Sequence, residues 1–207
     1  MTKLIASAFL VSSIALAQYK VEPAGPPPSE LAPAIAQALV KNGSKIVDAN
    51  GSVVCEVWLR TTAPTGGKPE PSTTLGSIPH GALLGAIRFT ATGSDRRGQT
   101  IKPGVYTLRY SFYPINGDHQ GVAPQRDFMI LLRAEDDKDL NQNFAFDPLM
   151  AESRKASGTP HPLCLSAWKA DTDFKPGFEQ VGPEDWALMA KLGDLPIAVI
   201  LVGTYAG

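Results

Sequence analysis

Three histidines are the side chains in this sequence best suited to bind a metal ion or to transfer a proton. His80, His119 and His161 each lie in a stretch rich in proline or glycine, so each is expected in a loop. Histidine is the commonest side-chain ligand of transition metals, and three of them suffice for a mononuclear copper or zinc site. Their spacing in the chain does not show that they converge, and the alternative is three separate solvated histidines.

The segment 114–127 is a second candidate site, because it joins two expected strands yet exceeds the two to five residues of a usual hairpin loop. Extra length between rigid strands is where binding residues tend to lie. We therefore predict a ligand site formed by Asp118, His119, Arg126 and Asp127. The alternative is that Asp118 caps a turn and that Arg126 pairs with Asp127 to hold the loop.

The local motifs of several large enzyme classes are missing from this sequence. It has no glycine-rich phosphate loop, no HExxH helix, no GxSxG turn, no CxxC pair and no dinucleotide fingerprint. These absences favour a noncatalytic binding or envelope protein of unidentified ligand. A copper- or zinc-binding protein, or a metal-dependent enzyme that uses the loop histidines, is the alternative.

Two further features are expected to be structural. Trp58, Trp168 and Trp186 could form a platform for carbohydrate stacking, but tryptophans in strands are more often part of the core. The acidic run at 135–139 lacks the register of a calcium-binding loop, so a solvated connection is expected there.

The two cysteines, Cys55 and Cys164, both lie in strand-like runs. In an oxidising compartment they can form one disulfide, although their distance in the fold cannot be derived from the sequence. The alternative is two separate buried thiols.

Residues 1–17 have the pattern of a secretory signal peptide. Lys3 precedes an apolar run, and Ala15-Leu16-Ala17 provides the small residues that signal peptidase requires. We expect cleavage before Gln18 and a periplasmic or extracellular protein. After cleavage no remaining apolar run is long enough to cross a membrane.

Composition favours one domain and excludes some partners. The chain has 207 residues and a formal net charge of −1, with no dense basic cluster, so nucleic acid is not an expected partner. A small molecule, a glycan or an envelope protein is expected instead. Residues 18–30 are rich in proline and predict an extended N-terminal arm, and residues 31–207 then form the folded domain.

The pattern of apolar residues predicts a mostly β protein. Strands are expected near 45–48, 52–60, 83–90, 105–113, 128–132, 163–168, 186–192 and 197–205. Helical periodicity is restricted to a short stretch before Asn42 and to residues 147–156, where Asp147 is expected to cap the helix. Short strands without βαβ alternation indicate a single-domain antiparallel β-sandwich or jelly-roll-like fold with one or two short helices.

Three segments carry a resemblance to a known group of proteins. The runs IKPGVYTLRY at 101–110, NGDHQG at 116–121 and QRDF at 125–128, with VCEVW at 54–58, resemble a family of uncharacterised secreted bacterial proteins. The resemblance implies a secreted β-sandwich. It implies no activity and no ligand residues.

Overall fold

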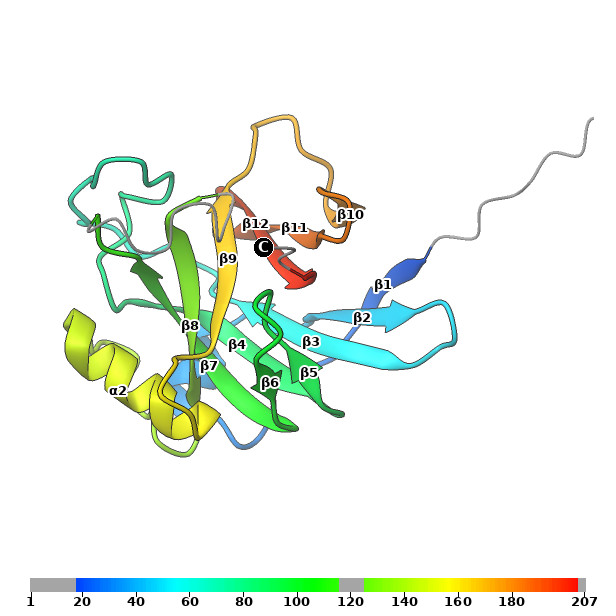
Figure 1. Cartoon of the computed structure of the whole chain (residues 1–207), viewed down its shortest axis with the longest axis horizontal. Helices are drawn as coiled ribbons and strands as arrows, with labels where there is room; N and C mark the ends of the chain where they lie inside the picture. The colour runs from blue at the N-terminus through cyan, green and yellow to red at the C-terminus, as the bar shows by residue number, and fades with distance from the viewer. Residues whose placement is uncertain (1–17, 116–124, 205–207) are drawn as a thin grey trace, which may run out of the picture.

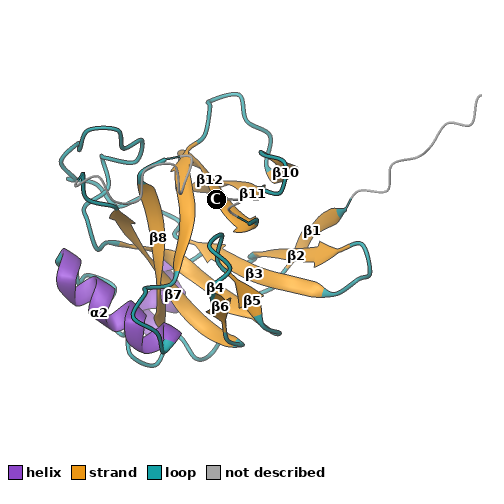
Figure 2. Cartoon of the chain, in the orientation of Figure 1, coloured by secondary structure: helices purple, strands orange, loops and turns teal. Residues whose placement is uncertain are grey.

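Twelve strands and two helices make up the described part of the chain, residues 18–115 and 125–204 of a computed structural model (Figures 1 and 2). Ten strands form one antiparallel sheet in the order β1-β2-β3-β4-β7-β8-β9-β12-β11-β10, and β5 and β6 form a separate hairpin. The strands are β1 Tyr19–Pro23, β2 Ser44–Asp48, β3 Val53–Leu59, β4 Leu83–Phe89, β5 Gly93–Ser94, β6 Thr100–Ile101, β7 Gly104–Phe112, β8 Asp127–Arg133, β9 Cys164–Lys169, β10 Gly177–Gln180, β11 Trp186–Leu192 and β12 Leu195–Val202. The helices are α1 Pro33–Ala38 and α2 Phe146–Ser157.

The mostly β character predicted from the sequence is confirmed, but the division into two packed sheets is not. Strand β9 pairs with β8 through Cys164–Ser166 and with β12 through Ala167–Lys169, so it joins the two halves of one continuous sheet. A strand that passes from one half to the other allows the sheet to fold back on itself. The result is nearly barrel-shaped.

The two edges of the sheet, β1 and β10, approach each other without pairing. Tyr19 of β1 makes edge-to-face contacts with Phe178 of β10 and Trp186 of β11, with ring centroids 5.3 Å and 5.0 Å apart. We call this meeting line the seam. Aromatic packing, and not a hydrogen-bond ladder, therefore closes the sheet.

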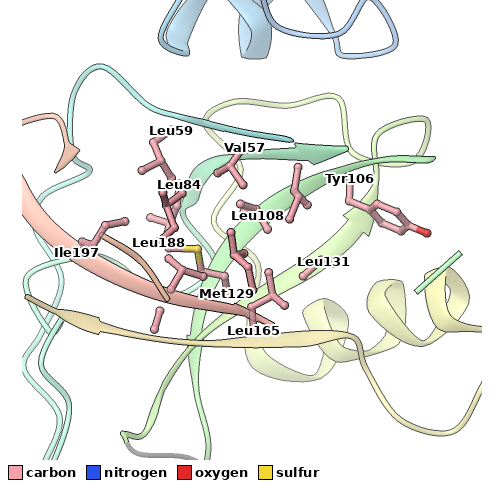
Figure 3. Close-up of a cluster of buried hydrophobic side chains, with 14 of the residues drawn as sticks. Val57, Leu59, Leu84, Tyr106, Leu108, Met129, Leu131, Leu165, Leu188 and Ile197 are labelled. Carbon is pink, nitrogen blue, oxygen red and sulfur yellow. The ribbon is translucent and has the colours of Figure 1, made fainter. Parts of the chain in front are cut away.

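The concave face of the sheet encloses the main core (Figure 3). Alternate side chains of β3 and β7 point into it, as the period-2 pattern predicts: Cys55, Val57 and Leu59 from β3, and Tyr106, Leu108 and Tyr110 from β7. Side chains from the opposite half of the sheet, such as Leu165, Leu188 and Ile197, meet them from the other side.

Both helices cover the convex face. Leu31, Ile35 and Leu39 from around α1 pack on Trp58 of β3, and Leu149 and Met150 of α2 pack on β8. The predicted cap of α2 is wrong, because the helix begins at Phe146 and Asp147 lies in its first turn, with Ala145 at the cap position. Neither helix has the length and apolar character needed to cross a bilayer.

Two segments rich in proline are ordered against the sheet. Residues 19–23 of the proline-rich arm form the edge strand β1, which pairs with β2. The segment 61–80 buries Leu75 and Ile78 in the main core. Strand pairing therefore holds the first segment, and burial of apolar side chains holds the second.

Candidate functional site

A polar hollow lies at one end of the seam, which we call the seam hollow. It has a volume of about 480 Å³. This volume falls within the roughly 300–1,000 Å³ of typical small-molecule sites. The described residues that line it come from two regions of the chain, 18–94 and 180–204: Gln18, Tyr19, Asp48, Val54, Phe89, Thr92, Gly93, Ser94, Gln180, Pro183, Glu184, Trp186, Leu201, Val202, Gly203 and Thr204.

The floor of the seam hollow is aromatic. Tyr19 and Trp186 are half-buried and line the hollow, and Phe178 stacks on Trp186 from behind with ring centroids 6.0 Å apart. Tyrosine and tryptophan rings combine a flat apolar face with a polar tip. Such a floor can bind a ligand that has both an apolar face and hydroxyl groups.

The rim of the seam hollow is polar, and the charged side chains that the described residues place there are acidic. Gln180, Thr92 and Ser94 contribute amide and hydroxyl groups, while Asp48 and Glu184 contribute carboxylates. Among the residues 18–115 and 125–204, no lysine, arginine or histidine lines the hollow. Carboxylates accept hydrogen bonds from hydroxyl groups but repel anions. A neutral or cationic ligand therefore fits, and an anionic one does not.

The turn that carries Glu184 and Trp186 is held by a salt bridge beneath the hollow. Arg96 donates from Nε and Nη2 to the two carboxylate oxygens of Asp185, at 2.8 Å and 2.9 Å. Asp185 is buried, and its carbonyl also accepts from the Val181 amide at 2.9 Å. Bidentate pairing of this kind fixes orientation as well as distance. The rim is therefore preformed.

Comparison with protein-family models, curated proteins and solved structures finds no match.

His80 is the predicted metal ligand with the most specific surroundings. Its Nε2 lies 2.9 Å from Ser111 Oγ of β7, and its Nδ1 lies 3.0 Å from the carbonyl oxygen of Phe144. The ring also contacts Phe112 edge to face, with centroids 5.4 Å apart. Both ring nitrogens thus have protein partners.

His80 and His161, the two predicted metal ligands that the structure describes, lie far apart. His80 contacts Phe146 at the first residue of α2, whereas the His161 carbonyl accepts from Ser157 at the last. At 1.5 Å per residue a helix of this length separates its ends by about 16 Å. His119 lies outside the described residues, and within the described ranges no three histidine, cysteine or acidic side chains group into a metal site.

Arg126 and Asp127 anchor segments of chain, and they do not pair with each other. The buried Asp127 carboxylate accepts hydrogen bonds from the Thr74 amide at 2.7 Å, the Thr74 hydroxyl at 2.8 Å and the Tyr110 hydroxyl at 2.7 Å. Arg126 donates to the carbonyls of Tyr113 and Pro71. The expected ion pair between them is therefore wrong, and both residues hold loops. Asp118 lies outside the described residues.

Cys55 and Cys164 are free thiols. Cys55 points into the main core, whereas Cys164 packs against the cluster beneath α2 on the opposite face of the sheet. Three strands, β4, β7 and β8, separate β3 from β9. The predicted disulfide is absent because the two side chains leave opposite faces of the sheet. Burial raises the pKa of both thiols, that of Cys164 to about 12.

The sequence interpretation missed a buried ion pair on the convex face. All five N–H groups of Arg109 are satisfied: its Nε and Nη2 donate to the two oxygens of Asp137 at 2.7 Å and 2.6 Å, and the others reach carbonyls of Gly81, Asp139 and Gln142. Both side chains have no exposed surface. The acidic run is solvated at its other four residues, as expected, but the buried Asp137 anchors it to β7.

Proposed function

We propose that this protein is a periplasmic or extracellular glycan-binding protein, and that its seam hollow holds a neutral sugar without acting on it. The observation that carries the proposal is the combination of an aromatic floor with a rim of hydroxyl, amide and carboxylate groups free of basic side chains. A pyranose has one face of C–H groups that stacks on an aromatic ring, and its hydroxyl groups donate to carboxylates and accept from amides. The volume of the hollow suits one or two sugar rings.

Secretion is part of the same proposal, and the position of β1 supports it. The expected cleavage before Gln18 leaves β1, which begins at Tyr19, intact. Tyr19 belongs to the floor of the seam hollow, so the site is complete in the cleaved form.

The test is calorimetric titration of the full chain with a panel of neutral oligosaccharides that differ in sugar and linkage. We expect at least one to bind with saturable heat, and Trp186→Ala to weaken it at least tenfold. Trp168→Ala is the matched control, because Trp168 is also half-buried but packs with Phe174 and Met189 away from the hollow.

The variant Glu184→Gln distinguishes a sugar ligand from a cationic ligand. Glu184 is exposed, so the fold should tolerate the change. A neutral sugar should lose only part of its affinity for this variant. Three results would contradict the proposal: no binding of any oligosaccharide by the folded protein, equal binding after Trp186→Ala, or binding of spermine but of no sugar.

A further inference from the structure

Ser111 lines a second pocket, which shares no lining residue with the seam hollow, and its hydroxyl contacts His80 behind the wall of that pocket. This pocket lies on the convex face of the sheet beside α2, and we call it the helix pocket. Ser111 is on β7, His80 precedes β4, and Phe144 precedes α2, so three distant segments meet here.

The hydrogen bonds of His80 determine its proton positions. The Phe144 carbonyl can only accept, so Nδ1 of His80 carries the proton and donates across 3.0 Å. In the neutral ring, Nε2 then has a lone pair, and the Ser111 hydroxyl donates to it across 2.9 Å. This is the arrangement in which a histidine accepts the proton of a nucleophilic serine, with a carbonyl in the place of the orienting carboxylate.

The His80 ring is also held in place. Phe112 contacts it edge to face at 5.4 Å, and Phe146 lies against it at 6.0 Å. The backbone of Gly81, which has a φ of +77°, packs directly on Phe144. Because its neighbours already fix the orientation of the His80 ring, little conformational entropy is lost when the ring accepts a proton.

The helix pocket beside Ser111 is small and mostly apolar. Its volume is about 80 Å³, and Phe112, Phe128, Ile130 and Met150 are among the residues that line it. An apolar cavity of about 150 Å³ holds benzene. A pocket of about half that size therefore fits an acyl group of about two to four carbons and excludes a long chain.

Two arginines form part of the wall of the same pocket. Arg96 is paired with Asp185, and Arg97 is bonded to Asp95 at 3.1 Å and to the Pro162 carbonyl at 2.8 Å. These pairs fix the wall near Ser111 without adding net charge to it.

We propose that Ser111 is a nucleophile, with His80 as its base, for short-chain carboxylic esters. This activity goes beyond sugar binding and does not depend on it. The Ser111 oxygen attacks the ester carbonyl carbon as its proton moves to His80 Nε2, and His80 passes that proton to the alcohol as the ester C–O bond breaks. Water then attacks the acyl-serine, again with His80 as base, which releases the carboxylic acid and restores the Ser111 hydroxyl.

The first experiment treats the purified full chain with a small alkyl fluorophosphonate and maps the adduct by mass spectrometry. We expect a single adduct on Ser111, formed at least a hundredfold more slowly in His80→Gln. Because this mapping uses the unmodified chain, it does not depend on whether a variant folds. Absence of an adduct on Ser111, or an adduct on another residue, overturns the proposal.

The second experiment measures hydrolysis of p-nitrophenyl acetate and p-nitrophenyl octanoate. We expect acetate to be favoured at least tenfold in kcat/KM, and Ser111→Ala to abolish the activity. Ser153→Ala is the matched control, because Ser153 is also buried but does not line the helix pocket. Equal hydrolysis by Ser111→Ala, equal loss in Ser153→Ala, or preference for octanoate contradicts the proposal. Trp186→Ala, which tests sugar binding, should leave this hydrolysis unchanged.

Discussion

Replacing Asp137 by asparagine should be among the most destabilising single changes in this protein. The carboxylate accepts from Thr107 at 2.5 Å and from two nitrogens of Arg109, and neither member of the ion pair is exposed to solvent. The substitution keeps the size of the side chain but leaves the Arg109 charge buried without a counter-charge. Breaking a buried ion pair in this way costs about 3–5 kcal/mol.

The assay is urea unfolding followed by circular dichroism, supported by calorimetry. For a chain of this length, a loss of that size lowers Tm by on the order of 10 °C. Glu152→Gln is the control, because the Lys155 ammonium that Glu152 pairs with at 2.6 Å is exposed to solvent, so the pair should contribute little to stability. If Asp137→Asn costs no more than Glu152→Gln, then the pair does not hold the acidic run to β7, and the argument from burial fails.

Three other changes test how loops and thiols are held. Asp127→Asn should weaken the hydrogen bonds that fix the segment 61–80 by about 1.5–3 kcal/mol, and so should speed tryptic cleavage at Lys68. An unchanged cleavage rate would contradict the anchoring role of Asp127. Burial raises the pKa of Cys55 and Cys164, so neither thiol should react with a disulfide reagent at pH 8 until the protein is unfolded. Rapid reaction of the folded protein would contradict this prediction. Gly81→Ala should lower the free energy of unfolding, measured by calorimetry, by more than about 1 kcal/mol, because φ of Gly81 is +77° and the added Cβ meets the Phe144 backbone. A variant of unchanged stability would show that this backbone can move.

The strands could be predicted because their side chains alternate. In β7 the aromatic residues at every second position face the core, and the observed strand, Gly104–Phe112, differs from the expected one by a single residue at each end. Thr107, Arg109 and Ser111 alternate with these residues and lie together on the other face, where all three are buried. What the alternation could not show is that α2 and the acidic run cover this face, because that depends on contacts between distant segments.

The candidate sites were harder to predict for the same reason. His80 was recognised as a chemical group, but its partners Ser111 and Phe144 are far from it in the chain. The seam hollow joins Tyr19, near the first described residue, to Trp186 near the last, and no local pattern connects them. A useful signal was present in Arg109 itself, since an arginine in the middle of a strand otherwise free of charge requires a buried partner. The acidic run provides that partner.

The seam also constrains the order in which the chain reaches its final form. Tyr19 lies at the start of the described chain, and the rings that it contacts, Phe178 and Trp186, lie close to its end. During synthesis the first strand emerges long before these partners exist, and contacts between distant residues form late in folding because the intervening chain must first be ordered. Until the seam closes, the two edge strands of the sheet, β1 and β10, do not cover each other. A truncation that removes β10, β11 and β12 should therefore leave two exposed sheet edges, β1 and β9, that favour aggregation.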